Sequence, residues 1–187
     1  LPEAFAQMAI RGLALDDVGD EADSWAVPLT TGGGFDIQER KRRLDGVLAL
    51  AERWEHEIDH SRHVTELSLR LFDELRLLHR LGTKERFWLE CGALLHDVGW
   101  VEGRKAHHKT SLRLILEGLN SGFSAREKRI VASIARYHRG ALPMGKHDHF
   151  AALSPVDQYR VTVLAGLLRV ADGLDRTHRK VVEGVTC

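Results

Sequence analysis

The stretch Ala93-Leu94-Leu95-His96-Asp97-Val98-Gly99 places two metal-type ligands directly after a run of core residues, at the predicted end of a helix. A neutral imidazole beside a carboxylate suits a borderline divalent cation. Gly99 follows the aspartate by two residues and predicts that the helix stops here, which lets both side chains face a cleft. A His-Asp pair is common by itself, so its meaning depends on whether other helices supply further ligands.

The composition limits the classes of protein to consider. The chain of 187 residues is long enough for one well-buried core with a small appendage. Its 27 basic and 27 acidic side chains give a net charge of zero and therefore no global attraction to nucleic acid or to an anionic membrane. No stretch approaches the roughly 20 apolar residues of a membrane helix, and no charged-then-apolar leader is present, so we expect a soluble cytoplasmic protein. Eleven histidines are a high count for this length and direct attention to metal binding.

Residues 1–37 differ from the rest of the chain and are predicted to be an N-terminal extension or connector. They contain an acidic run after Leu15 and end in Gly32-Gly33-Gly34. Triple glycine can cradle phosphate where it links a strand to a helix, but no Lys-Ser/Thr pair follows here and no clear strand precedes it. We therefore favour a flexible connector over a phosphate loop. Residues 1–15 are compatible with a short helix.

From Gln38 onward, apolar residues recur at steps of three and four and predict six amphipathic helices within one domain, residues 38–187. Ser124-Ala125-Arg126-Glu127 is a capping box, Ser154-Pro155 a cap followed by proline at the first helical position, and Thr83 a candidate N-cap. Strand-like alternation is nearly absent. These features predict an all-α fold, a compact bundle of crossing helices. The helices are expected at about residues 38–54, 56–78, 83–97, 107–117, 124–139 and 154–172.

The second predicted helix carries His56, His60 and His63 on one face. His60 precedes Val64 by four residues and so continues the buried stripe, whereas His63 lies to one side. A single histidine of this kind is more often a hydrogen-bonded core or surface residue than a metal ligand. The balance changes because further candidate ligands occur at the ends or inward faces of other helices.

Together, His60, His96, Asp97 and Asp172 are two imidazoles and two carboxylates delivered by three helices. Such a set predicts a mononuclear metal site with open positions for water and substrate. One of the adjacent histidines at 107 and 108, together with His138, would extend it to a second ion. The histidines outside these blocks are expected at the surface, namely His147, His149 and His178.

In their order along an all-helical chain, these residues resemble the HD superfamily of metal-dependent phosphohydrolases. More narrowly, the chain resembles the C-terminal helical domain of the exopolyphosphatase and guanosine pentaphosphate phosphatase (Ppx/GppA) family, over about residues 35–180. In that family the domain follows two actin-like lobes that hold the polyphosphate site, and residues 1–34 do not resemble those lobes. Exopolyphosphatase activity is therefore not carried over. The blocks that carry the resemblance are His60-Ser-Arg-His-Val64, His107-His108-Lys109-Thr110-Ser111, Tyr137-His138-Arg139 and Leu167 to Arg176.

The resemblance implies a compact HD-domain bundle in which Asp97 is a catalytic residue and bridges two divalent ions if His108 and His138 complete a second site. Between the adjacent histidines it favours His108, whose spacing to Ser111 matches the position used by binuclear HD phosphodiesterases, and it makes His107 a rim residue. A metal-bound water with a lowered pKa would supply the hydroxide that attacks phosphorus. The donor types accept manganese, magnesium, iron, zinc or nickel. The full expected ligand set is His60, His96, Asp97, His108, His138 and Asp172.

Basic residues adjoin the ligand blocks and are candidates to neutralise phosphate charge. Lys109 and Arg139 are expected to be catalytic in this sense. For each arginine, pairing with a carboxylate to orient helices is an equally good interpretation. The other members of this basic group are Arg104, Lys105, Arg169 and Arg176.

Two functions from different classes follow. The first is a metal-dependent phosphohydrolase acting on a nucleotide or another small phosphoester. The second is a non-catalytic module that binds a phosphate-rich ligand or a partner chain. The intact ligand set favours the enzyme, since a pure binding domain has no need to aim both imidazoles and both carboxylates at one point. The expected partner is a small phosphorylated ligand, and a homodimer is left open.

Overall fold

The computed structural model describes residues 36–54 and 57–187. The described part is mainly helical and contains no strand, which confirms the all-α prediction. Within it, no helix combines the length and the apolar character of a membrane span. The predicted short helix at residues 1–15, the glycine connector at residues 32–34 and His56 lie outside the described residues.

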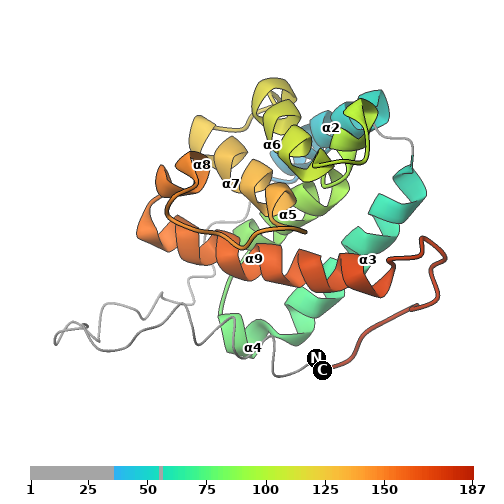
Figure 1. The fold of residues 1–187 in the computed structure, drawn as a ribbon. Helices are drawn as coiled ribbons and strands as arrows, with labels where there is room; N and C mark the ends of the chain where they lie inside the picture. Colours follow the sequence, from blue (N-terminus) through green and yellow to red (C-terminus); the bar gives the residue numbers. More distant parts are fainter. Residues whose placement is uncertain (1–35, 55–56) are drawn as a thin grey trace, which may run out of the picture. The chain divides into compact units, whose positions relative to one another are not determined.

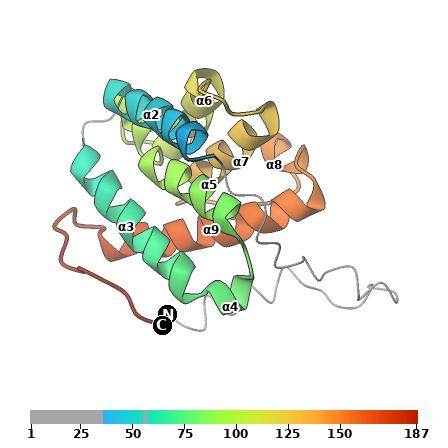
Figure 2. The same ribbon diagram turned by 180° about the vertical axis from the view of Figure 1, so that it is seen from behind.

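The helices occur close to the predicted ranges, with short additional turns between them (Figure 1). The longest, α9, runs along one side of the bundle, and α3 passes its C-terminal half (Figures 1 and 2). Close packing also joins α3 to α5, α5 to α7 and α6 to α7. In chain order the elements are α2 (Ile37–Trp54), α3 (Ile58–Glu74), α4 (Arg76–His79), α5 (Thr83–Leu94), the 3-10 helix η3 (Val98–Glu102), α6 (His107–Gly118), α7 (Ala125–Arg136), α8 (Asp148–Ala151) and α9 (Pro155–Leu174).

Local capping signals set the starts of α5, α7 and α9. The Ser124 hydroxyl accepts a hydrogen bond from the Glu127 N–H, and the Glu127 carboxylate accepts one from the Ser124 N–H, which confirms the capping box of α7. Ser154 caps α9 as predicted. The cap of α5 is Gly82, not Thr83, because the Glu85 carboxylate accepts the Gly82 N–H at 3.0 Å and Thr83 is already helical.

The core lies where the apolar faces of α3, α5, α7 and α9 meet. On α3 the predicted stripe of Val64, Leu67 and Leu71 is buried, and His60 extends it as expected. Full burial of an aliphatic side chain contributes about 1.5 to 3 kcal/mol. The stripe therefore holds the first turn of α3 firmly against the bundle and fixes the position of His60.

Gly99 has a different role from the one the sequence suggested. Helix α5 ends at Leu94, so the helix stops before His96 without any glycine cap. Gly99 lies in η3, where a Cβ atom would be 2.1 Å from the His107 carbonyl oxygen and 2.6 Å from the Ser111 nitrogen. Its N–H donates to the Ser111 hydroxyl, which in turn donates to the His96 carbonyl. Glycine is needed here because α6 approaches the His96-Asp97 turn too closely for any side chain.

We expect Gly99→Ala to lower the free energy of unfolding by about 1 to 3 kcal/mol, the usual cost of forcing extra atoms into a packed contact. Urea denaturation followed by circular dichroism measures it. Gly166→Ala is the control, because a Cβ there meets nothing within 4 Å. In a helix interior that change stabilises by roughly 0.5 to 1 kcal/mol. Equal stability of the Gly99 variant and the wild type would contradict the packing role.

Candidate metal centre

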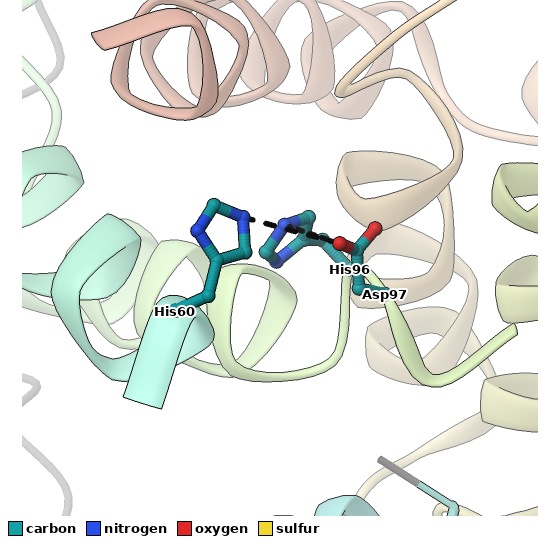
Figure 3. Close-up of side chains that lie close together, drawn as sticks. All are labelled: His60, His96 and Asp97. Atoms are coloured by element: carbon teal, nitrogen blue, oxygen red, sulfur yellow. Dashed lines mark ion pairs between the residues drawn. The ribbon is translucent and has the colours of Figure 1, made fainter. Parts of the chain in front are cut away.

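A first ligand group forms where the start of α3, the turn after α5 and the end of α9 meet. One nitrogen or oxygen atom from each of His60, His96 and Asp97 lies within 4.8 Å of the others (Figure 3). The His96 Nε2 atom is 3.4 Å from Asp97 Oδ2, and the His60 Nε2 atom is 3.9 Å from the same oxygen. Asp172 adjoins the group, with its Oδ1 atom 3.5 Å from His60 Nε2 and 3.7 Å from His96 Nε2.

A second ligand group shares Asp97 and adds one histidine from α6 and one from the turn that follows α7. It consists of Asp97, His107 and His138, all buried. Asp97 Oδ1 is 3.0 Å from His107 Nε2 and 3.5 Å from His138 Nε2, and the two Nε2 atoms are 3.1 Å apart. The two oxygens of one carboxylate therefore face two different pairs of imidazoles.

The Nδ1 atoms of these histidines are all engaged away from the centre. Three of them contact a backbone carbonyl, which can only accept a hydrogen bond, so Nδ1 carries the proton in the neutral ring. Each neutral ring then presents the lone pair of Nε2 to the centre, the arrangement typical of metal-binding histidines. The contacts are His60 to Asp175 Oδ2 at 2.9 Å, His96 to Ala93 O at 2.7 Å, His107 to Arg104 O at 3.0 Å and His138 to Ala135 O at 2.7 Å.

The donor set fits a divalent cation. His60 Nε2, His96 Nε2 and Asp97 Oδ1 are buried and have no hydrogen-bond partner. Burying polar atoms without partners costs free energy, and burying a carboxylate costs more. A cation between these atoms would satisfy all three, with imidazole and carboxylate donors that borderline divalent metals accept.

The charges around His96 favour the protonated form of its ring. Burial lowers the pKa of His96, but the nearby charges of Asp97 and Asp172 outweigh it and raise the pKa to about 9. Burial raises the pKa of Asp97, yet the charge of His96 and the contact with His107 bring it well below its usual range. Burial lowers the pKa of His138 to about 3, so this ring is neutral at pH 7. A metal must therefore displace the proton of His96.

The structure brings His107, not His108, next to Asp97. His107, expected at the rim, is 1% exposed and contacts Asp97, so the rim assignment is wrong. The His108 ring lies outside the ligand groups, with its centroid 6.3 Å from that of His138. Neighbouring residues on a helix point about 100° apart, so only one of the two can reach Asp97. The contact between Gly99 and Ser111 fixes the rotation of α6 about its axis, and this rotation turns His107 toward Asp97.

The remaining predicted residues fall into two sets. His60, His96, Asp97, His138 and Asp172 are brought together as expected. The two basic side chains predicted to be catalytic, at positions 109 and 139, are exposed and lie outside the ligand groups. Their charges are among those that lower the pKa of His108, after burial and the charges at positions 136 and 107.

Two residues at the centre were missed by the sequence reasoning. Asp175 is buried and receives the Nδ1 contact of His60, and the only hint was its position three residues after Asp172. His178, expected at the surface, has a side chain 27% exposed and stacks on His60 with ring centroids 3.7 Å apart and planes 1° from parallel. The centroid of the Trp100 ring lies 5.6 Å from that of His178. No periodic pattern in the sequence indicates this stacking.

Comparison with known proteins gives two findings. Residues 42–186 match the family model described as Ppx/GppA phosphatase, domain III. The chain is also 29% identical over 138 residues to the guanosine-5'-triphosphate,3'-diphosphate pyrophosphatase of Pseudoalteromonas translucida (strain TAC 125). That match covers 71% of this chain and 25% of the relative, so the chain spans about a quarter of the length of the relative.

The exchange of ligand roles at positions 107 and 108 is directly testable. We expect His107→Ala to lower the amount of metal retained after dialysis, because it removes an Nε2 donor 3.0 Å from Asp97. His108→Ala is the matched control and should retain the metal content of the wild type. Elemental analysis of both variants after loading with manganese provides the measurement. The reverse result would restore the assignment made from the sequence.

The proton held by His96 predicts that metal binding depends on pH. Its pKa of about 9 means that the ring is charged at pH 7 and must release a proton when metal binds. Affinity should rise by roughly tenfold for each pH unit up to about 9 and level off above it. Calorimetric titration with manganese in two buffers of different ionisation enthalpy counts the released protons. Binding at pH 7 without proton release would contradict this electrostatic picture.

Proposed function

Because this chain belongs to the Ppx/GppA phosphatase family through its domain III, we propose that it is a metal-dependent phosphohydrolase of the HD type. The substrate is a nucleotide or another small phosphoester. One observation carries the proposal: the buried and unpartnered Nε2 atoms of His60 and His96 converge on the Asp97 carboxylate. A helical domain with a purely structural role has no need of such an arrangement.

The first ligand group, with Asp172, would hold one divalent ion, and the second would hold another through the shared Asp97 carboxylate. When bound, the ions supply charge neutralisation and an acidified water. His107 raises the number of imidazole donors to four. Since Mg²⁺ prefers oxygen ligands, this set favours manganese, iron, zinc or nickel over magnesium.

The other residues of the centre orient these donors. Asp175 fixes the ring of His60 by its contact with Nδ1 at 2.9 Å. The Ser111 hydroxyl holds the turn that carries His96 by donating to its carbonyl at 2.7 Å. Partners of this kind keep ligand atoms aimed at one point without reorganisation.

Substrate would approach from the side of Asp172. Its side chain is 25% exposed, whereas those of His60, His96 and Asp97 are between 0 and 7% exposed. Arg169 is near, since its charge and that of Asp172 interact. One of its terminal nitrogens donates to the Gly140 carbonyl, and the other is buried without a hydrogen-bond partner, so it lacks an acceptor that a phosphate oxygen would supply. Exposed Lys109 and Arg139 would add charge at the entrance.

The name of the relative suggests which substrates to test first. That protein is a pyrophosphatase of guanosine-5'-triphosphate,3'-diphosphate, and guanine nucleotides phosphorylated at both ends therefore join the panel. Because the match covers only a quarter of the relative, its activity is a proposal for this chain.

Hydrolysis should require divalent metal and Asp97. With manganese present, the protein should hydrolyse bis-p-nitrophenyl phosphate or members of a panel of mono-, di-, cyclic and bisphosphorylated nucleotides. Asp97→Asn should reduce the rate to background, because it removes the charge shared by both ligand groups. Asp59→Asn, an exposed carboxylate beside His60, is the matched control and should leave the rate unchanged.

A metal-loaded preparation that binds one of these compounds but converts none would contradict the enzyme. The chain would then be a non-catalytic module for a phosphate-rich ligand. Release of product would be followed by absorbance for the activated ester and by phosphate release for the nucleotides.

A further inference from the structure

The segment that follows α9 returns along α3 and passes the start of that helix (Figures 1 and 2). We call residues 176–187 the strap. Its Val182 carbonyl oxygen lies 3.0 Å from His63 Nε2, and the Cys187 N–H donates to the Glu74 carboxylate at 3.2 Å. The strap is therefore attached to α3, the helix that carries the ligand His60.

The backbone of the strap is strained where it leaves α9. His178 has a φ of 56° and Lys180 a φ of 52°, both in the left-handed region that costs free energy for residues with a side chain. Asp175 holds this turn, because its carbonyl accepts the His178 N–H at 2.8 Å and its Oδ1 atom accepts the Lys180 N–H at 2.7 Å. Strain of this kind persists only where surrounding contacts impose it, and it is often found at functional sites.

The ring of His178 is held against that of His60. The two ring centroids are 3.7 Å apart and the planes are 1° from parallel. The Nδ1 atom of His178 contacts the carboxylate of Glu57, which can only accept, so Nδ1 donates. Glu57 directly precedes α3, three residues before His60. The ring of Trp100 is also stacked with that of His178, at 5.6 Å between centroids. His178 is thus fixed in place over one face of a ligand ring.

His60 needs such support more than the other ligand histidines do. A metal accepts the Nε2 lone pair in the plane of the ring, so a tilt of the ring moves the lone pair away from the ion. His60 Nδ1 contacts a side chain, Asp175 Oδ2, and a single hydrogen bond tolerates a range of angles. A ring stacked on the face blocks the remaining tilt. The other rings each contact the backbone carbonyl three residues earlier, at His96, His107 and His138.

We propose that His178 is a positioning residue of the metal centre. Together with Glu57, it fixes the plane of the His60 ring and so determines how firmly, and in what geometry, the first ligand group holds its ion. The second ligand group does not contain His60, so its ion is held independently of His178. This inference rests on the metal binding that the proposed function assumes, but not on hydrolysis.

The test follows cobalt(II), whose absorption bands report the geometry of its ligands. His178→Ala should change these bands, because the His60 ring can then tilt. It should also speed the release of the first ion to EDTA by roughly two- to tenfold, the scale of one stacked ring pair. The release phase that is absent from His60→Ala identifies this ion. Arg179→Ala, at the exposed neighbouring position of the strap, is the matched control and should behave as the wild type.

A conservative variant separates the ring from its hydrogen bond. His178→Phe keeps a ring that can stack and the same backbone constraint, but it cannot donate to Glu57. It should therefore restore part of the wild-type release rate. If His178→Ala does not fold, Glu57→Gln serves instead, because it weakens the contact that holds the His178 ring and leaves the ring present. Its release rate should move in the same direction by a smaller factor.

Combination with His60→Ala distinguishes positioning from a structural role. If His178 acts through His60, then His178→Ala should have no further effect on cobalt release once the His60 ring is absent, since the effects of contacting residues are not additive. A purely structural role would instead speed cobalt release in both backgrounds, lower the melting temperature of the metal-free protein and leave the cobalt bands of His178→Ala unchanged.

Unchanged bands and an unchanged release rate in His178→Ala, or an equal effect of Arg179→Ala, would overturn the positioning role. This result is distinguishable from failure of the proposed function. Cobalt binding that depends on His178, without hydrolysis of any tested phosphoester, would reject the enzyme and keep the role of His178. A wild type that binds no cobalt would reject both.

Discussion

The burial of one carboxylate, that of Asp97, is the constraint on which the rest of this structure depends. An ionised carboxylate away from water is tolerated only where cations or hydrogen-bond donors surround it. Here the surrounding groups are imidazoles from α3, the turn after α5, α6 and the end of α7. The close approach of α6 at Gly99 and the buried stripe of α3 both serve to bring those rings to the same carboxylate.

The rings are aimed by two kinds of contact. His96, His107 and His138 each contact the carbonyl oxygen three residues earlier, at the end of a helix or the start of one, so their orientation is set locally. His60 instead uses Asp175, which is 115 residues away in the chain. The orientation of His60 therefore depends on the docking of the C-terminal end of α9, and His178 beyond it adds a stacked ring.

Two buried arginines show how differently the same side chain can be used. Arg43 donates to the Glu127 carboxylate at 2.9 Å and lies 4.1 Å from the centre of the Phe123 ring, so it joins α2 to the N-terminal end of α7. Arg136, at the other end of α7, lacks any carboxylate partner among the described residues. A paired cation stabilises the packing of helices, whereas a buried cation without a carboxylate partner costs free energy.

The sequence by itself determined the helical fold, the starts of α7 and α9, and most of the residues that meet around Asp97, because periodicity and capping are local properties. It identified His60 by its place in the buried stripe and the His96-Asp97 pair by adjacency. Only the tertiary structure shows which of His107 and His108 lies next to Asp97. They precede Ser111 by four and by three residues, and on a helix both spacings place a residue on the same face as Ser111. The rotation of α6 comes from its contact with Gly99, and the pairing of His60 with Asp175 comes from a distant helix. Both are long-range contacts, and no local pattern in the chain encodes them.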